Sequence, residues 1–199
     1  MTEVGPSGVK GSVQVKEATE EEIKDKTILE TIKYEDAEKT FKSDLQIESG
    51  IAKSVTTNQQ ENERFNKILK IEACVQEALK EQYGESYKSS VRVSNGDRQV
   101  ILDGLIYSKK GKIKSAVEIK YISSKRFESI RFIIARKLRQ LYTFGIKRLT
   151  IFLVSDSFTE EEILDVYNQN LHQAQIYFFT WDGVSTKELK IPNRKNPIV

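Results

Sequence analysis

Two apolar, β-branched runs joined by a short basic turn constrain the fold of this chain more than any other feature. The runs cover residues 99–107 and 113–122, and a Lys-Lys-Gly-Lys segment at 109–112 lies between them. Gly111 can adopt the positive φ that a tight hairpin turn requires. We therefore expect an antiparallel pair of strands that closes at this turn and lies in the central part of a sheet.

Each of these two strands carries charged residues that the other strand can meet. Closing the pair at the turn brings Asp103 roughly opposite Glu118. Side chains alternate between the faces of a strand, so Glu118 and Lys120 share a face and Ile119 points to the other one. The alternative is structural, with Asp103 as a turn cap and Glu118 and Lys120 as a solvated ion pair. Charges on an apolar central strand are seldom left unpaired, which favours a functional site.

The segment before the strands predicts an amphipathic helix over residues 63–83. Its apolar side chains recur at helical spacing and form a stripe suited to packing on a sheet, made of Phe65, Ile68, Leu69, Ile71, Val75, Leu79 and Tyr83. At about 100° per residue, Glu72 projects near the centre of that stripe. We predict that Glu72 is the acid of this helix that faces the core. The alternative is an acid at the edge of the stripe that reaches solvent or a lysine.

Helices and strands alternate after the paired strands. The expected elements are a helix at 129–144, a buried strand at 148–154, an acidic helix at 159–171, a strand at 175–181 and a tail from 191. The predicted fold is thus α/β, with a mixed central sheet flanked by helices in the order αβββαβαβ. Residues 61–199 are expected to form this domain.

The charged residues of the paired strands resemble the signature of the PD-(D/E)XK nuclease superfamily, which has the restriction-endonuclease-like fold. The matching pattern is Asp103, a gap of fourteen residues, and then Glu118-Ile119-Lys120. Leu102 stands where many members of the superfamily have proline. The resemblance covers roughly residues 63–181.

This resemblance implies a metal-dependent nuclease that hydrolyses phosphodiester bonds, with a DNA endonuclease as the first expectation and RNA as an open alternative. Asp103 and Glu118 would be catalytic ligands of Mg²⁺, for which Mn²⁺ could substitute, together with the carbonyl of Ile119. Lys120 would support the attacking water or the charge that develops in the transition state, and Glu72 would be an auxiliary ligand. The alternatives are a catalytically inactive nucleic-acid-binding or assembly module with the same fold, and a protein-interaction module.

Basic residues are concentrated around the expected site. Residues 104–148 contain 13 Lys or Arg against 2 acids, a balance of +11, whereas residues 1–64 contain 9 against 14, a balance of −5. A basic region of this kind attracts nucleic acid, although a solvated basic surface has the same composition. The candidate contact residues are Lys109, Lys112, Lys125, Arg126, Lys137 and Gln140. For Lys137 the alternative is a snorkelling side chain that covers apolar surface.

Residues 1–60 are polar and contain too few large apolar side chains for a core. We predict an N-terminal arm that is disordered or binds a partner, either a second copy of the chain or another protein. An acidic cover for the basic region is a further alternative, and a passive tail is favoured over both of these roles. Within this arm, residues 19–33 can form a helix that starts at a capping box made of Thr19 and Glu22.

The residues that the chain lacks narrow its chemistry. It has one histidine and one cysteine, which excludes a nuclease built on a histidine base, a cysteine-rich zinc site and an intrachain disulfide. It has neither a glycine-rich phosphate loop nor a dinucleotide motif. Because no apolar run approaches the length of a membrane span, we expect a cytoplasmic protein in a reducing compartment, without a membrane partner.

Overall fold

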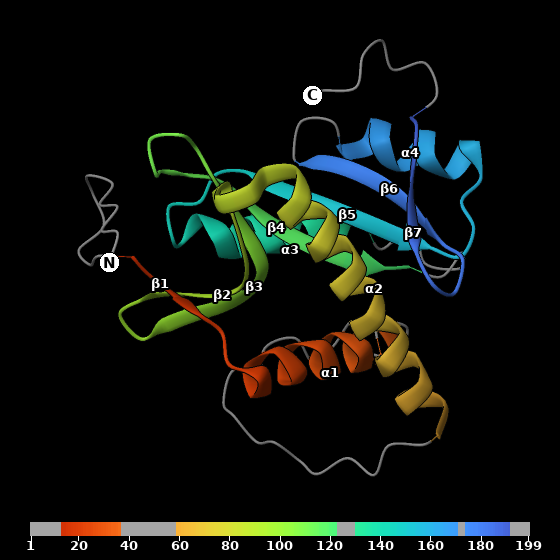
Figure 1. Cartoon of the computed structure of the whole chain (residues 1–199), viewed down its shortest axis with the longest axis horizontal. Helices are drawn as coiled ribbons and strands as arrows, with labels where there is room; N and C mark the ends of the chain where they lie inside the picture. Colours follow the sequence, from red (N-terminus) through yellow and green to blue (C-terminus); the bar gives the residue numbers. More distant parts are fainter. Residues whose placement is uncertain (1–12, 37–58, 123–129, 171–173, 192–199) are drawn as a thin grey trace. The chain divides into compact units, whose positions relative to one another are not determined.

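A single mixed β-sheet organises the chain (Figure 1). The structure is a computed structural model that describes residues 13–36, 59–122, 130–170 and 174–191. In these residues the fold is α/β, with seven strands and four α-helices, as the sequence predicted at this level. The chain divides into two units, Thr19–Lys70 and a larger one that combines Met1–Ala18 with Ile71–Val199.

The strands of the larger unit lie in the sheet in the order in which they occur in the sequence, from β1 to β7. Their bounds are Gln14–Glu17 (β1), Tyr87–Asn95 (β2), Arg98–Tyr107 (β3), Ile113–Tyr121 (β4), Leu149–Ser155 (β5), Gln175–Trp181 (β6) and Thr186–Leu189 (β7). Strands β1 to β4 pair antiparallel, β4 to β6 pair parallel, and β7 is antiparallel to β6. The sheet is therefore mixed, with its parallel part in the centre.

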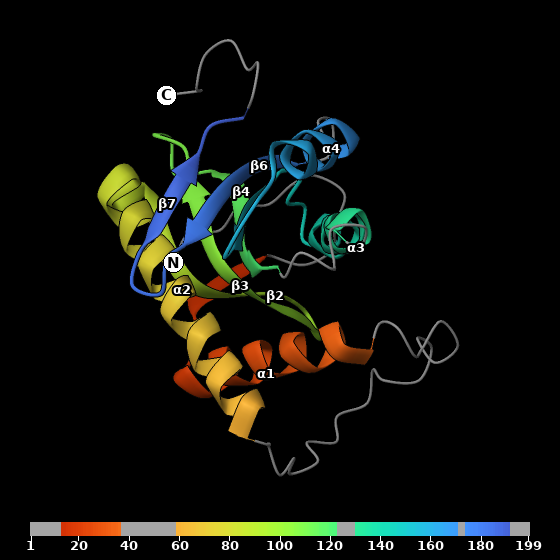
Figure 2. The ribbon, with the colours of Figure 1, turned by 90° about the vertical axis from the view of Figure 1, so that its right-hand side faces the viewer.

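Helices cover both faces of this sheet. Their bounds are Gln59–Tyr83 (α2), Ile130–Tyr142 (α3) and Glu160–Asn170 (α4), and a short 3-10 helix, Gly84–Ser86, leads from α2 into β2. α3 and α4 connect the parallel strands and lie on one face, while the part of α2 from Ile71 onward lies on the other (Figure 2). The order from α2 to β6 is the predicted αβββαβαβ, and β1 and β7 extend the sheet at its two edges.

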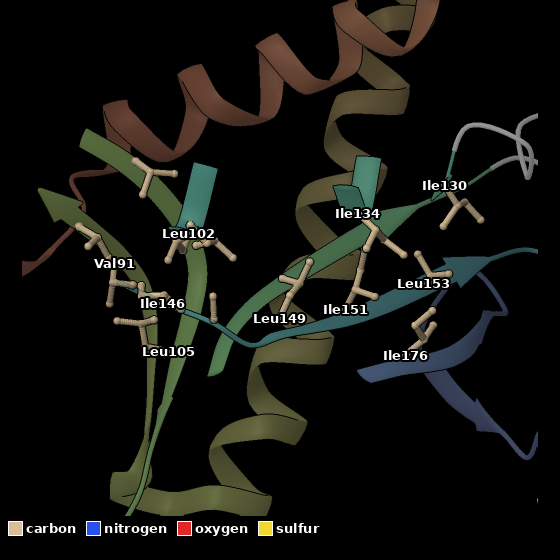
Figure 3. Close-up of a cluster of buried hydrophobic side chains, with 14 of the residues drawn as sticks. Val91, Leu102, Leu105, Ile130, Ile134, Ile146, Leu149, Ile151, Leu153 and Ile176 are labelled. Atoms are coloured by element: carbon tan, nitrogen blue, oxygen red, sulfur yellow. The ribbon is translucent and has the colours of Figure 1, made fainter. Parts of the chain in front are cut away.

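Each face of the sheet has its own apolar cluster. On the α3 and α4 face, Ile130 and Ile134 of α3 pack with Ile151 and Leu153 of β5 (Figure 3). On the α2 face, the cluster joins Ile71, Val75 and Leu79 of the helix to strand residues that include Val117, Ile119, Phe152 and Trp181. All seven residues of β5 are buried, as a parallel strand covered on both faces requires.

Strand β4 contributes side chains alternately to the two clusters. Ala116 and Ile122 belong to the α3 cluster, whereas Val117 and Ile119 belong to the α2 cluster. By this alternation, Glu118 and Lys120 point to the α3 face, and both are buried. The predicted sharing of one face by these two charged residues is thus confirmed, and their surroundings are apolar.

The turn between β3 and β4 closes as predicted. Gly111 has φ of 71°, and its N–H donates to the carbonyl of Ser108 at 2.9 Å. The N–H of Ser108 in turn donates to the carbonyl of Lys112 at 2.8 Å. The pairing beside the turn joins Tyr107 to Ile113, and a one-residue register shift between Ile106 and Tyr107 then gives the register that carries Asp103 toward Glu118.

The smaller unit, Thr19–Lys70, contains α1, Glu20–Asp36. The predicted capping box is present, because the N–H of Thr19 donates to Glu22 Oε2 at 2.8 Å and the N–H of Glu22 donates to Thr19 Oγ1 at 3.2 Å. No described helix combines the length and the apolar character that crossing a membrane would need.

One strand lies in the segment that was expected to be a polar arm. β1 pairs with β2, Val13 and Ala18 at its ends are buried, and the N–H of Ala18 donates to the carbonyl of Ser90 at 2.8 Å. The polar strand gains its stability from this edge pairing, which the sequence pattern did not indicate.

Candidate active site

The site begins where β3 and β4 separate. Their pairing in the described residues runs as far as Gly104 and Val117, and the next position in the same register would place Asp103 opposite Glu118. β4 nevertheless continues along β5 as far as the pair of Tyr121 with Val154. The two strands that carry the acids therefore diverge at the acids themselves.

The Asp103 carboxylate closes this gap. Backbone groups of a strand alternate between its two neighbours, and the N–H groups of Ala116 and Ile122 both donate toward the β5 side. The N–H of Ile119 consequently points toward β3, where it donates to Asp103 Oδ2 at 2.7 Å. The carbonyl of Ile119 faces the same side, because both backbone groups of a strand residue point to the same neighbour. The Asp103 side chain thus accepts the hydrogen bond that a backbone carbonyl of β3 would accept if the two strands stayed paired.

The backbone around Asp103 is held by side chains from other elements. The Tyr87 hydroxyl donates to the Asp103 carbonyl at 3.2 Å, and Gln76 of α2 donates to the same carbonyl at 3.4 Å. The ladder between β2 and β3 skips Ser90, which has φ of 49°, in the left-handed region. Such strain costs of order 1–3 kcal/mol and persists where the surroundings enforce it, often beside functional groups.

Gly104 allows an aromatic ring to lie directly on the strand next to Asp103. A Cβ atom at this position would approach the Tyr87 ring to 2.4 Å, closer than side-chain carbons occur in proteins. Glycine is therefore required at position 104 so that the Tyr87 ring can approach the strand closely. It lets Tyr87 reach the Asp103 carbonyl and fixes the end of the β3–β4 ladder.

Four charged side chains meet at this point and form what we call the carboxylate–lysine cluster, made of Asp103, Glu118, Lys120 and Lys137. Lys120 Nζ lies 2.9 Å from Glu118 Oε2 and 4.0 Å from Asp103 Oδ2. Lys137, on α3, places its Nζ 2.8 Å from Glu118 Oε1. Each oxygen of Glu118 therefore contacts an ammonium group.

The cluster is almost sealed from solvent. The exposed fractions of the side chains are 1% for Glu118, 4% for Lys120, 5% for Asp103 and 14% for Lys137. A single buried charge is very unfavourable, and two carboxylates facing two ammonium groups balance one another. Strands supply three of the four groups, so their positions depend on the most rigid part of the fold.

The donor set of the cluster suits a hard divalent cation. Mg²⁺ binds oxygen ligands and commonly uses one or two carboxylates, with the rest of its shell from water and substrate. Asp103 and Glu118 provide two carboxylates beside the backbone of Ile119, and Glu118 already attracts two positive groups. Among the described residues, no group of three or more His, Cys, Asp or Glu side chains is placed to hold a metal.

Glu72 occupies the core-facing side of α2. It is buried, as the apolar stripe predicted, with an exposed fraction of 6%. Its neighbours on α2, Ile71 and Val75, pack with Val117 and Ile119, on the opposite face of β4 from Glu118. Its role as an auxiliary ligand stays a prediction.

The other predicted contact residues have different positions. Lys109, Lys112 and Gln140 are exposed, as a nucleic-acid contact requires. Lys125 and Arg126 lie outside the described residues. Lys137 had two expected roles, phosphate contact or snorkelling, and the structure gives it a third, as an ion-pair partner of Glu118. The sequence signal for this was a lysine in the apolar sector of its helix.

No protein-family model matches this chain, and no curated protein matches it in sequence. The function must therefore be argued from the carboxylate–lysine cluster.

Proposed function

We propose that this protein is a metal-dependent nuclease with a restriction-endonuclease-like core, acting first of all on DNA. One observation carries the proposal: Asp103, Glu118 and Lys120 come together where two central strands separate, with ammonium–carboxylate distances of 2.9 and 4.0 Å. The order of elements from α2 to β6 and the basic composition of residues 104–148 support it.

The residues of the cluster have separate roles in this proposal. Asp103 is oriented by the Ile119 N–H and presents its carboxylate at the gap between the strands. Lys120 supplies a fixed positive charge that steadies the attacking water or the negative charge growing on the phosphate oxygens. Lys137 adds a second positive charge at the Glu118 carboxylate and can turn to a substrate phosphate.

A divalent ion would be held by Asp103 and Glu118, with the Ile119 carbonyl beside them. Such an ion, when bound, neutralises phosphate charge and makes a water molecule more acidic. Because ammonium groups contact both oxygens of Glu118, a divalent ion would compete with Lys137 and Lys120 for this carboxylate.

The test is cleavage of supercoiled plasmid, linear duplex and single-stranded DNA by the purified chain with Mg²⁺, Mn²⁺ or chelator. We expect metal-dependent cleavage that Asp103→Asn and Lys120→Met each reduce at least a hundredfold, the size of effect of removing one transition-state donor. Val166→Ala is a matched control. It truncates a buried side chain of α4 and lowers stability without touching the cluster.

Cleavage that survives in folded Asp103→Asn or Lys120→Met would contradict the assigned roles. Loss of cleavage in Val166→Ala to the same extent would trace the effect to stability instead. Far-UV circular dichroism on every variant separates these outcomes from unfolding.

A second candidate is a nucleic-acid-binding module without catalysis, and the closed ion pairs of Glu118 favour it, since they resemble a finished structural network. This candidate predicts DNA binding that weakens steeply with salt, with no cleavage on any substrate or metal. It also predicts that Mg²⁺ leaves the melting temperature unchanged, whereas a nuclease site binds the ion even without substrate.

A further inference from the structure

The outward side of α3 exposes two aromatic rings. Four large hydrophobic side chains are exposed in the described residues, and the two aromatic ones, Phe132 and Tyr142, are both on α3 at 70% exposure. Ile130, Ile134 and Leu141 are the buried residues of the same helix, so the helix is anchored on its inner side. Two exposed rings on one helix are of interest for binding when the residues between them form a common surface with them.

Arginines lie between these rings. Arg136 is one turn from Phe132, Arg139 is three residues before Tyr142, and both are exposed. α3 spans Ile130–Tyr142 and has no acidic residue. We call Phe132, Arg136, Arg139 and Tyr142 the α3 outer face. It has the composition of a surface that binds an anion carrying flat, apolar groups.

We propose that the α3 outer face binds a single-stranded segment of nucleic acid, with bases stacked on Phe132 and Tyr142 and phosphates paired with Arg136 and Arg139. Stacking on an exposed ring needs an uncovered base face, which a duplex interior does not offer. The inference rests on the proposed function, because it takes nucleic acid as the substrate. It adds that the bound segment of this substrate has unpaired bases.

The dimensions of the helix agree with this occupant. Phe132 and Tyr142 are ten residues apart, about 15 Å along the helix at 1.5 Å per residue. That distance corresponds to about four steps of 3.4 Å in a stacked strand. Lys137, on the inner side of α3, is part of the carboxylate–lysine cluster, and a helix is about 10 Å thick. A few nucleotides can therefore connect the α3 outer face to the cluster.

The charge of this face argues against self-association. A twofold contact between two copies would bring the same surface patch together, with arginines facing arginines. An isologous dimer here would bury like charges without acidic partners on α3. Phosphates supply the missing negative charge directly.

The experiment is fluorescence anisotropy with a labelled twelve-nucleotide dT strand and a labelled twelve-base-pair blunt duplex, in chelator so that no cleavage occurs. We expect Phe132→Ala and Tyr142→Ala each to weaken binding of the single strand about five- to 150-fold, the range found for loss of one stacked base. Binding of the duplex should change less than about twofold. Matched controls are Val184→Ala, which removes an exposed apolar side chain between β6 and β7, and Arg98→Ala, which removes an exposed arginine at the start of β3.

Several results would overturn the proposal: single-strand affinity within twofold of wild type in both aromatic variants, an equal loss on strand and duplex, or equal losses in Arg136→Ala and Arg98→Ala. Sedimentation that shows a wild-type dimer dissociated by Phe132→Ala, with DNA binding unchanged, would assign the face to self-association and would equally overturn it.

The proposal and the nuclease assignment can fail separately. Aromatic-dependent strand binding in a protein that cleaves nothing would retain the α3 outer face and reject the nuclease. Metal-dependent cleavage, with no effect of Phe132→Ala or Tyr142→Ala on strand binding or cleavage, would retain the nuclease and reject the α3 outer face as a binding site.

Discussion

Replacing Glu118 by glutamine removes the negative charge that Lys120 and Lys137 share. Glutamine keeps the shape of the side chain, but Lys120 loses its charged partner at 2.9 Å and Lys137 loses its charged partner at 2.8 Å. Removing one partner of a buried ion pair costs about 3–5 kcal/mol. For a chain of this size, that predicts a fall in melting temperature of about 6–20 °C.

A double-mutant cycle with Lys137→Met tests the origin of that cost. Lys137→Met alone should cost about 1.5–3 kcal/mol, because a charged hydrogen bond is lost while Glu118 keeps Lys120. The combination with Glu118→Gln should be less destabilised than the sum by about 1–3 kcal/mol, since an uncompensated ammonium group disappears from the core. The assay is urea unfolding without metal, followed by circular dichroism.

A matched cycle uses Lys112→Met, a lysine in the exposed turn between β3 and β4. Its effect should add to that of Glu118→Gln within about 0.5 kcal/mol. If the Lys137 cycle is equally additive, the 2.8 Å contact does not form in solution, and the ion pair between Lys137 and Glu118 is refuted.

Three further predictions concern metal, packing and pH. Mg²⁺ at about 100 times its dissociation constant should stabilise the protein by about 2.7 kcal/mol. Lys137→Met should lower that dissociation constant, because the ammonium group of Lys137 no longer competes with the ion. Equal dissociation constants for the variant and the wild type, measured by calorimetry, would contradict this competition. Gly104→Ala should cost about 1–3 kcal/mol, since the new methyl group meets the Tyr87 ring, and should cost little in a Tyr87→Ala background; equal costs in both would refute the contact. The backbone N–H of Ser185 and other groups of its turn lower the pKa of Asp182. The stability that the Asp182 carboxylate contributes is thus complete above the unfolded carboxyl pKa of about 3.9, and it is lost as the pH falls through the lower folded pKa. Asp182→Asn should therefore reduce the loss of stability at acidic pH. Superimposable pH–stability curves for the variant and the wild type would disprove this prediction.

The meeting of Asp103, Glu118 and Lys120 could be predicted because it depends on local rules. A hairpin turn closes the strand pair, and the two-residue period of a strand decides which side chains share a face. The one-residue register shift between Ile106 and Tyr107, which completes the register opposite Glu118, was not predicted. Glu72 could be placed in the core by the helical period for the same reason. These features require only sequence separations that one turn or one helix spans.

The partners contributed by distant elements could not be predicted. Lys137 reaches Glu118 only because α3 crosses back over the sheet between two parallel strands, and its position on the helix does not reveal which strand residue it meets. The edge strands β1 and β7 are short and polar, and they exist through pairing rather than through propensity. The left-handed φ of Ser90 likewise follows from its surroundings, since serine has no preference for it.

The bond from the Ile119 N–H to the Asp103 carboxylate has an evolutionary consequence. Because this carboxylate completes the hydrogen bonding of a central strand, selection for folding alone would preserve it, and glutamate, one methylene longer, would not fit the same gap. A descendant that had lost its chemistry would therefore keep Asp103 and change Lys120 and Glu118 together, as a charge pair. If the proposed function holds, joint retention of that pair in related sequences would be the sign of activity, and the aspartate alone would indicate only that the sheet is preserved.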